Sequence, residues 1–480
     1  MDSLLGVFAK TVDRHPDRVA IIDGKGRKVT FAALMSRINS LAAAWQRQGI
    51  GAGDRVLMAM PLGSDLYASL AALWSLGATV VLPEPAMGIA GVRHAVHTAG
   101  VTAFCASGGY RVLRMLLPRL WLTRQLRLTD TRGAFVPVVT SKTDIALISF
   151  TSGSSGKPKA IPRSHGFLLA QHKALAPLLD SASDERDLVA FPVFALLNLA
   201  AGRTSILPDW KMSNLAELTP EQLHNWIARQ GATRALLPPS LCQKLGGIAL
   251  PPRLHSIFTG GGPVFPDMIA RLQTTNPRLN VTCVYGSTEA EPIAILDTAT
   301  VTADDHQAML AGAGLLAGPP VAGLQLRIMN DEIQGAGPHV NEGYLDPADN
   351  AQNKIRVDET IWHRTGDAGR LDSQGRLWLW GRTGTQVTIA EGQVYPFVIE
   401  VAAHQWPGVQ QCALMYMATK PVLVIEGDRT AFAIWQENAQ TLGIHHLHHM
   451  TRIPMDRRHA SKIDRKALAR VLAKHLAKTR

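Results

Sequence analysis

The sequence predicts an α/β protein of at least two domains, and its length, composition and patterning all support that prediction. At 480 residues the chain exceeds what one ordinary hydrophobic core can organise. Its 46% hydrophobic and 18% charged residues are typical of a globular protein. Helical and strand-like patterns alternate along its N-terminal part, which favours βαβ units and a doubly wound, mostly parallel sheet.

The alternation starts close to the N-terminus. Residues 31–50 have helical spacing that stops at Gly49, and residues 54–60 (DRVLMAM) form a short apolar run typical of a strand. A second helical pattern covers residues 64–77, and a second strand-like run follows at residues 78–85. Later strand-like runs lie at residues 188–194, 233–240, 254–262 and 281–291. Together these runs predict sheets flanked by helices.

Beyond about residue 315 the alternation of helices and strands gives way to short strands and turns, for example in residues 361–382. This change indicates a small β subdomain. The run GRTGTQ at residues 381–386 contains glycine and threonine, which permit a flexible joint. We therefore predict a large N-terminal domain of layered sheets over residues 1–383 and a small α+β C-terminal domain over residues 384–480.

Several classes of protein are disfavoured. The most apolar run, residues 66–82, is interrupted by Ser, Gly and Thr, so it predicts a buried helix and strand rather than a membrane span. The first residues show no signal-peptide pattern. The four cysteines are too widely spaced for a zinc site or a disulfide framework. The expected compartment is the cytoplasm.

The net charge of +11 is compatible with nucleic-acid binding, but its distribution favours another interpretation. Residues 451–480 contain ten Lys and Arg against two Asp. In the same stretch Leu468, Val471, Leu472 and Leu476 recur at helical spacing, which predicts a terminal helix with a solvated basic face. We expect no nucleic-acid partner.

The histidines within residues 445–449 (HHLHH) contain two H-x-x-H spacings, a pattern found in transition-metal sites. Alternation along a strand would place these rings on both faces of the chain, and no acidic residue adjoins them. A metal site is therefore disfavoured here.

Residues 150–160 (FTSGSSGKPKA) have the composition of a phosphate-binding loop. The spacing of Gly153 and Gly156 excludes a Walker A loop, and the lack of G-x-G excludes a dinucleotide fingerprint. Glycine backbone, hydroxyl donors and the ammonium of Lys159 nonetheless suit a polyphosphate. The hydroxyl donors are those of Thr151, Ser152, Ser154 and Ser155. A Gly/Ser surface turn is the alternative interpretation of this segment taken alone.

Five further segments follow this loop in order. They are residues 258–264 (FTGGGPV), 284–291 (VYGSTEAE), 363–367 (HRTGD), 380–396 (WGRTGTQVTIAEGQVYP) and 457–468 (RRHASKIDRKAL). With the loop, they resemble the motifs of the AMP-forming adenylating enzymes, which include acyl-CoA synthetases, peptide-synthetase adenylation domains and luciferases. The resemblance implies that ATP is split to AMP and pyrophosphate to activate a carboxylic acid, and that the small C-terminal domain is mobile.

The resemblance also implies roles for single residues at the nucleotide. Tyr285 would stack on adenine, Thr288 would bond the α-phosphate and Glu289 would bind Mg²⁺. Asp367 would accept both ribose hydroxyls, for which a carboxylate has suitable acceptors, and Arg382 would assist at ribose or phosphate. The implied ATP-binding set is completed by Gly261, Gly262 and Gly286.

Two residues would serve the mobile C-terminal domain. Lys462, in the string SKIDR, would stabilise the charge that develops as the acid attacks the α-phosphorus. Gly384 occupies the hinge position, where Asp or Lys is usual in the family. A glycine permits the backbone rotation but offers no side-chain contact to hold either state.

The acid pocket is expected at residues 190–202 (AFPVFALLNLAAG) and at the first glycine of FTGGGPV, which the resemblance places near the acyl pocket. The residues expected to line it are Phe194, Ala195, Leu197, Asn198 and Gly260. Peptide-synthetase domains for α-amino acids carry an aspartate where this chain has Ala195, so a buried ammonium would lack a counter-charge. An acyl or aryl acid is favoured. The alternative, that this segment is only a buried strand–helix junction, leaves the substrate open.

In this family the acyl-adenylate usually passes to a thiol, so CoA or the phosphopantetheine of an acyl carrier protein is the expected acceptor. A finer, partial similarity exists: FPVFALLNLAAGRTSILPD and RRHASKIDR resemble the β-lactone synthetases of bacterial olefin biosynthesis. Those enzymes adenylate a β-hydroxy acid, whose own hydroxyl then attacks. Thioester formation ranks first and lactone formation second. A non-catalytic nucleotide-binding relative is disfavoured because Glu289, Asp367 and Lys462 occur together.

Overall fold

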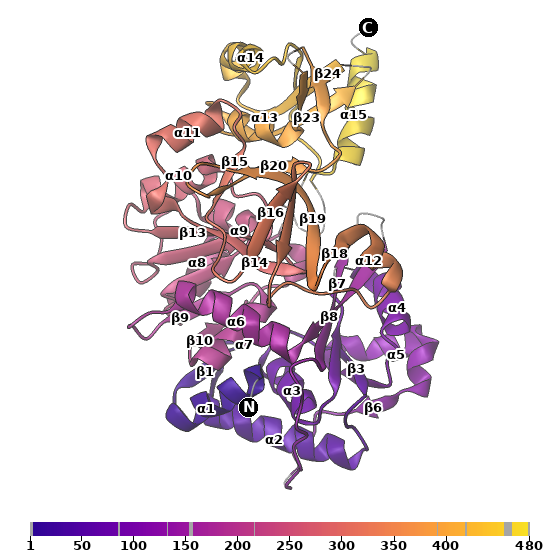
Figure 1. The fold of residues 1–480 in the computed structure, drawn as a ribbon. Helices are drawn as coiled ribbons and strands as arrows, with labels where there is room; N and C mark the ends of the chain where they lie inside the picture. Colours follow the sequence, from indigo (N-terminus) through magenta and orange to yellow (C-terminus); the bar gives the residue numbers. More distant parts are fainter. Residues whose placement is uncertain are drawn as a thin grey trace.

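The computed structural model describes residues 3–84, 87–131, 133–152, 157–215, 217–390, 392–417, 420–455 and 463–478. In Figure 1 the N-terminal elements lie at the bottom and the C-terminal strands and last helix at the top. The described residues form three large sheets, a three-stranded sheet and a two-stranded ribbon.

An eight-stranded sheet has the order β14-β13-β12-β11-β9-β10-β1-β2. The strands from β13 to β1 run parallel to one another. The edge strands β14 and β2 pair antiparallel with β13 and β1. The strands are β1 (Val19–Ile22), β2 (Lys28–Thr30), β9 (Arg186–Val189), β10 (Thr204–Ile206), β11 (Arg234–Leu237), β12 (Ser256–Gly260), β13 (Asn280–Ser287) and β14 (Ala290–Asp297). Short buried runs of this kind are typical of parallel strands covered on both faces.

A six-stranded sheet has the order β6-β5-β3-β4-β7-β8 and is parallel except at the β7/β8 edge. Its strands are β3 (Arg55–Ala59), β4 (Thr79–Leu82), β5 (Ala103–Ala106), β6 (Arg124–Leu126), β7 (Ile145–Ser152) and β8 (Pro158–Ser164). The prediction of mostly parallel sheets flanked by helices is confirmed, because βαβ crossovers build both sheets.

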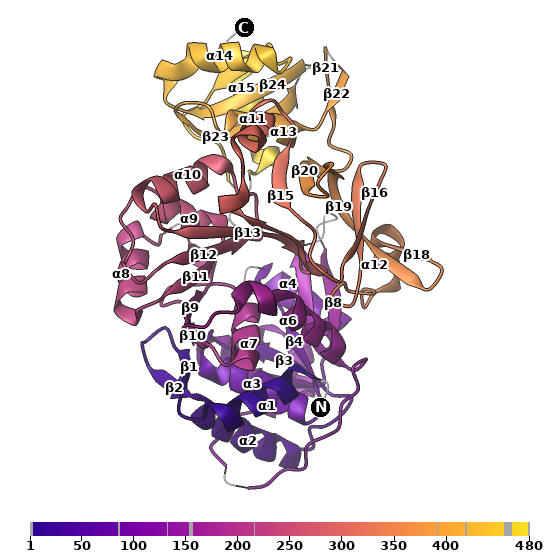
Figure 2. The same cartoon turned by 60° about the vertical axis from the view of Figure 1, so that its left-hand side comes forward.

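Helices cover these two sheets (Figure 2). They are α1 (Leu4–Arg14), α2 (Phe31–Arg47), α3 (Ser64–Ser75), α4 (Gly88–Thr98), α5 (Leu113–Leu116), α6 (His165–Leu179), α7 (Pro192–Ala201), α8 (Pro220–Gln230), α9 (Pro239–Leu245), α10 (Pro266–Thr275) and α11 (Ala303–Leu310). Short 3₁₀ turns occur at η2 (Gly108–Val112), η3 (Pro118–Leu122), η4 (Met212–Asn214) and η5 (Thr298–Thr300).

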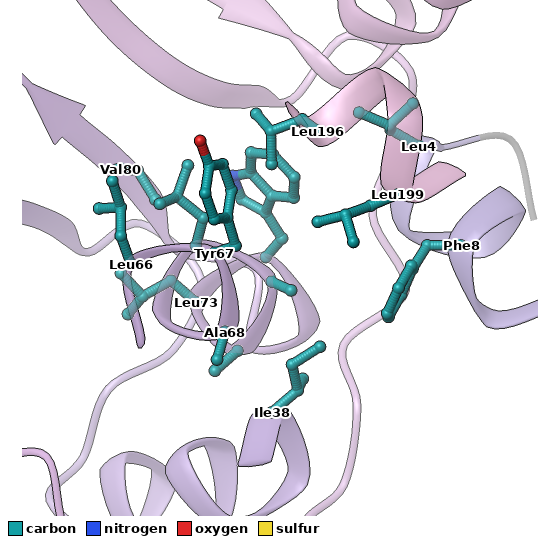
Figure 3. Packing of buried hydrophobic residues seen from close by; sticks show 14 of the residues in the cluster. Leu4, Phe8, Ile38, Leu66, Tyr67, Ala68, Leu73, Val80, Leu196 and Leu199 are labelled. Atoms are coloured by element: carbon teal, nitrogen blue, oxygen red, sulfur yellow. The ribbon is translucent and has the colours of Figure 1, made fainter. Parts of the chain in front are cut away.

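Helix α3 is buried on every side between α1, α2 and α7. Figure 3 shows Leu66 and Leu73 of α3 in one apolar cluster with Leu199 of α7 and Phe8 of α1. The apolar run 66–82 is therefore a core helix followed by β4, as its sequence predicts. Within the described ranges, no helix is long and apolar enough to cross a membrane.

A third, antiparallel sheet follows, with the order β15-β20-β19-β17-β16 and β18 paired to β19. Its elements are β15 (Leu315–Gly318), β16 (Gln325–Met329), β17 (Glu332–Ala336), α12 (Pro347–Asn353), β18 (Lys354–Val357), β19 (Thr360–Leu371) and β20 (Leu377–Arg382). This sheet is the β subdomain that the change of pattern near residue 315 predicts.

The remaining elements surround a three-stranded sheet. They are β21 (Val387–Ile389), β22 (Gly392–Val394), α13 (Pro396–Ala403), β23 (Val409–Met417), β24 (Lys420–Gly427), η6 (Arg429–Ala431), α14 (Phe432–Thr441), β25 (Leu447–His449) and α15 (Arg465–Lys478). Gly384, between β20 and β21, has a left-handed φ of 73°, and a Cβ there would contact nothing within 4 Å. The fold class is confirmed, and the division at residues 383 and 384 stays a prediction.

The structure places two segments of this C-terminal part that the sequence singles out, the basic tail and the histidine run. Helix α15 buries Leu468 and Leu472, so the basic tail includes an amphipathic helix. His449 stacks on Trp435 with ring centroids 6.2 Å apart. Across the part of the chain that the structure describes, no group of three or more His, Cys, Asp or Glu is placed to hold a metal ion.

Candidate active site

Both parallel sheets direct the carboxyl ends of their strands toward one cavity of about 2090 Å³. Gly260 at the end of β12 and Tyr285 in β13 line it from the eight-stranded sheet, and Met58 in β3 and Thr151 in β7 line it from the other. Ligands of open α/β sheets bind at such ends. The volume exceeds that of an ordinary small-molecule pocket, so the cavity has room for two substrates together.

Two glycines let the chain pack closely around this cavity. A Cβ atom on Gly260 would lie 2.3 Å from the carbonyl oxygen of Val284 in the neighbouring strand. A Cβ atom on Gly286 would lie 2.8 Å from the carbonyl oxygen of Ala290. Any side chain at either position would force these segments apart. Close backbone packing therefore explains the glycine at both positions.

A hydrogen-bonded group of three polar residues joins two sheets at the cavity. Tyr285 Oη donates to Asp367 Oδ2 at 2.8 Å, and Arg382 Nε lies 3.3 Å from Asp367 Oδ1. Asp367 and Arg382 are opposite each other in β19 and β20. Burial, and then the negative charge of Asp367, raise the pKa of the Tyr285 phenol well above its usual value, so the phenol stays a donor.

A second polar cluster surrounds Glu289. Tyr344 Oη donates to Glu289 Oε1 at 2.9 Å. The ammonium groups of Lys159 and Lys354 lie 5.3 and 5.6 Å from the centroid of the Tyr344 ring. Lys354 Nζ donates to the carbonyl of Asn341, whose own N–H donates to the carbonyl of Glu289. Burial lowers the pKa of Lys354 to about 8, and the charge of Glu289 partly opposes that shift.

These groups fit ATP bound with Mg²⁺. Glu289 supplies a hard oxygen donor, and Mg²⁺ is commonly held by one or two carboxylates together with phosphate oxygens. Lys159 is only 8% exposed, so its charge acts in a site with little water. Ser287 belongs to the cavity wall, and its buried Oγ has no hydrogen-bond partner among the described residues. A bound phosphate would supply that partner.

The helical geometry of α7 corrects part of the predicted acid pocket. Phe194 and Gly260 line the cavity. Ala195, Leu197 and Asn198 are not part of its wall in the described structure; each is at most 1% exposed, and Asn198 Nδ2 donates to Ser205 Oγ in the core. Successive side chains of a helix turn by about 100°, so only one face of α7 reaches the cavity. The structure therefore places these three residues, which the sequence predicts at the acid pocket, in the core behind the cavity wall.

Two side chains of opposite charge, Arg163 of β8 and Glu291 of β14, line the cavity, and Glu291 is half-buried. Arg163, only 5% exposed, donates from Nη2 to the carbonyl of Thr288 at 2.8 Å. Its Nε has no hydrogen-bond partner among the described residues. Glu291 Oε2 accepts from Gln171 Nε2 at 3.3 Å. Burial lowers the pKa of Arg163 and raises the pKa of Glu291, while the attraction between the two charges opposes both shifts.

The sequence profile of the family described as AMP-binding enzyme matches residues 8–345. The chain belongs to this family. A relative named olefin beta-lactone synthetase, from Xanthomonas campestris, is 28% identical over 95% of this chain and 94% of its own. Another, named 2-succinylbenzoate–CoA ligase, from Oceanobacillus iheyensis, is 24% identical and covers 85% of each chain. The structure of O-succinylbenzoate coenzyme A synthetase from Bacillus subtilis, in complex with ATP and magnesium ion, superposes with a TM-score of 0.76 at 18% identity, over 96% of this chain and 98% of its own. That likeness shows a common fold.

As an AMP-binding enzyme of the adenylating superfamily, the protein activates an acid with ATP. The resemblance read from the ordered motifs is confirmed, and so is the partial likeness to β-lactone synthetases. The structure brings most of the predicted nucleotide residues to one cavity: Thr151, Lys159, Gly261, Gly262, Tyr285, Gly286, Thr288, Glu289, Asp367 and Arg382. Their individual roles stay predictions.

Some predicted residues of the AMP-binding motifs lie outside the described part of the chain. These are Gly153, Ser154, Ser155, Gly156 and Lys462, as well as the side chain of Ser152. The flanking residues are placed: Thr151 pairs with Lys159 across β7 and β8, and both line the cavity. Ile463 and Arg465, which follow Lys462, line it too.

Three cavity residues escaped sequence reasoning, Arg163, Glu291 and Tyr344, and so did Lys354, whose ammonium lies over the Tyr344 ring. Each is a single residue without a motif of its own. Arg163 and Glu291 share one signal, a charged side chain inside a strand, which is costly to bury unless a partner or ligand satisfies it.

Proposed function

We propose that this AMP-binding enzyme activates a β-hydroxy acid as its acyl-adenylate and that the acid's own hydroxyl then closes a β-lactone. Arg163 and Glu291 carry this proposal, because they place a hydrogen-bond donor and an acceptor in the wall of one cavity. The extent of the similarity supports it as well: the relative named olefin beta-lactone synthetase matches over 95% of this chain, and the 2-succinylbenzoate–CoA ligase over 85%.

In the first step, an oxygen of the acid carboxylate attacks the α-phosphorus. The bond to pyrophosphate breaks, and pyrophosphate leaves with the electron pair. Tyr285 and Asp367 would hold the adenosine, while Thr288, Lys159 and Lys462 would stabilise charge on the phosphoryl oxygens by position and electrostatics. Mg²⁺ held by Glu289 would neutralise charge on the phosphates.

The Arg163–Glu291 pair suits a neutral hydroxyl better than a charged substituent. The two charges oppose each other, so the pair gives no net attraction to an ammonium or a second carboxylate. A hydroxyl both donates and accepts. It would accept from Arg163 Nε, which lacks a partner among the described residues, and donate to the Glu291 carboxylate. Arg163 also holds the carbonyl of Thr288, so this hydroxyl would lie close to the reacting carboxyl group.

In the second step, Glu291 would take the hydroxyl proton while the alkoxide oxygen attacks the acyl carbon. A C–O bond forms in the four-membered ring, the bond between the acyl carbon and the phosphate oxygen breaks, and AMP leaves with that electron pair. Burial raises the pKa of Glu291 above its ordinary value, although the charge of Arg163 opposes that shift, and a carboxylate with a raised pKa is a better proton acceptor.

The experiment separates the two steps by mass spectrometry without CoA. Glu291→Gln keeps the size and a hydrogen-bonding group but removes the proton acceptor. With a β-hydroxy acid, we expect acid-dependent pyrophosphate release to persist within about tenfold, and lactone formation to fall by 10²-fold or more, as for loss of a general base. Glu84→Gln, at another carboxylate of the cavity wall, is the matched control. Equal lactone formation by the Glu291 variant would contradict its role, and no pyrophosphate release with any acid would contradict the activation step itself.

Transfer to a thiol is the second candidate, favoured by the 85% coverage of the 2-succinylbenzoate–CoA ligase. CoA or the phosphopantetheine of a carrier protein would then be the acceptor. The same mass spectra decide between the two: a thioester that forms only with CoA, and no lactone without it, supports this candidate and overturns lactone closure.

A further inference from the structure

Residues 112–122 expose a large amount of apolar side-chain surface. Met115 is 76% exposed, Trp121 60% and Leu122 92%, and Val112 and Leu116 are exposed by 47% and 42%. These five are among fourteen exposed large apolar side chains in the described residues, and the others are mostly scattered along the chain. Single exposed apolar residues are ordinary, but a cluster marks an interaction surface. We call these five residues the outer apolar surface.

The segment that carries this surface is apolar on both of its faces. It consists of η2, α5 and η3 in succession. Leu113, Leu117 and Leu120 point into the core, where they join the same cluster as Val92 and Val96 of α4. A segment whose outer face meets only water usually carries polar residues there. Figure 1 places α5 at the edge of the molecule beside α4.

Basic residues flank the outer apolar surface without acidic ones. Residues 107–128 contain five Arg and no Asp or Glu. Arg111, Arg119 and Arg127 are exposed. Arg114 instead donates to Gln125, and Arg124 pairs with Asp54. Three arginines around exposed Trp, Leu and Met form the pattern of a surface that lies in the headgroup region of an anionic bilayer.

The cavity reaches the molecular surface beside this patch. Tyr110 and Leu113, from the same segment, line the cavity. Ile89 of α4 also lines it and is 46% exposed, so the cavity opens there. The nearby wall is apolar, with Leu66 and Val92 contributing to it. An acid with an alkyl or aryl body that leaves a bilayer at this surface would meet an apolar passage rather than water.

We propose that the outer apolar surface docks the enzyme on an anionic lipid bilayer, with the cavity opening facing the membrane. Met115, Trp121 and Leu122 insert among the upper acyl chains, and Arg111, Arg119 and Arg127 bind headgroup phosphates. Uptake of a membrane-dissolved acid by this route rests on the proposed function, whereas the docking itself does not.

Co-sedimentation with vesicles tests the docking without any enzyme assay. Wild-type protein is expected to bind phosphatidylcholine vesicles that contain about a quarter phosphatidylglycerol, and to bind more weakly to phosphatidylcholine alone. The double variant Met115→Ser/Leu122→Ser is expected to lower the partition coefficient by roughly tenfold or more, because two inserted side chains are lost. Arg111→Gln/Arg119→Gln is expected to lower it by roughly tenfold on the anionic vesicles only, and added salt should have the same selective effect.

Matched variants elsewhere on the surface serve as controls. Val139→Ser/Ile434→Ser removes two apolar side chains that are 97% and 46% exposed, and Lys25→Gln/Arg253→Gln removes two exposed charges. Both should bind like wild type. The proposal is overturned if the wild type binds neither kind of vesicle. It is also overturned if the control variants lower the partition coefficient as much as the variants of the outer apolar surface. Sedimentation of the wild type as an oligomer that Met115→Ser/Leu122→Ser makes monomeric overturns it too, since the surface would then be a contact between copies of the chain. Failure of the acid-activation assay leaves the vesicle result unaffected.

Discussion

Tyr285 Oη donates a 2.8 Å hydrogen bond to Asp367 Oδ2, and this bond connects β13 of the eight-stranded sheet to β19 of the antiparallel sheet. The residue expected at the adenine and the residue expected at the ribose are thus held in register before any nucleotide arrives. Because Arg382 approaches the second Asp367 oxygen at 3.3 Å, the carboxylate is oriented from two sides.

We predict that Asp367→Asn raises the KM for ATP by about 10- to 100-fold, because a hydrogen bond to a charged group contributes roughly 1.5–3 kcal/mol. Acid-dependent ATP–pyrophosphate exchange measures this change. Tyr285→Phe keeps the aromatic face and loses only the hydroxyl, so its effect should be the smaller of the two. An unchanged KM for ATP in Asp367→Asn would contradict the prediction that this residue binds the ribose.

Lys462→Ala is predicted to slow pyrophosphate release by about 10²- to 10³-fold, the cost expected for loss of one preorganised donor to a developing negative charge. Exposed Lys466, four residues further along, is the matched control, and Lys466→Ala should behave like wild type. Rapid-quench measurement of the first turnover reports the step directly. Equal rates in the two variants would show that Lys462 is simply another lysine of the basic tail.

The pH dependence of ATP use should reveal Lys354. Burial lowers the pKa of Lys354 to about 8. Its side chain therefore carries a positive charge below that pH and loses the charge above it. We predict that kcat/KM for ATP, which reports the free enzyme, falls as the pH rises through about 8. Lys354→Arg keeps a positive charge at all these pH values, so its kcat/KM for ATP should change little as the pH rises through about 8. If kcat/KM for ATP still falls above about pH 8 in Lys354→Arg, the titrating group is another residue.

His404 should make the fold sensitive to acid. Its ring stacks on Phe265 with centroids 3.8 Å apart, and burial lowers the pKa of His404 to about 3. The unfolded chain takes up a proton near pH 6.5 while the folded chain does not, so the free energy of unfolding falls as the pH drops below about 6.5. Between pH 7 and pH 5 this one group accounts for a loss of about 2 kcal/mol.

His404→Phe preserves the aromatic contact and removes the titration. Urea denaturation at pH 7 and pH 5 should show a correspondingly smaller loss of stability in this variant than in wild type. The same loss in both proteins would mean that other groups, such as the buried His363, carry the acid sensitivity.

Much of the fold and half of the site could be predicted from the sequence, for a physical reason. Local apolar runs specify parallel strands, and Gly260 and Gly286 belong to short motifs whose backbone needs glycine. Ala195 was misplaced because a motif does not say which face of a helix meets the cavity. Arg163 and Glu291 lie in strands of different sheets, 128 positions apart, and only the tertiary fold brings them to one wall.

Arg163 touches both halves of the reaction. Its Nη2 donates to the carbonyl of Thr288, the residue expected at the α-phosphate, and its buried Nε has no hydrogen-bond partner among the described residues. An acid without a suitably placed hydroxyl would leave Arg163 Nε without an acceptor, and an unsatisfied buried donor disfavours binding of that acid. Selection would therefore act before ATP is cleaved, and the enzyme would need no separate step to discard a wrongly activated acid.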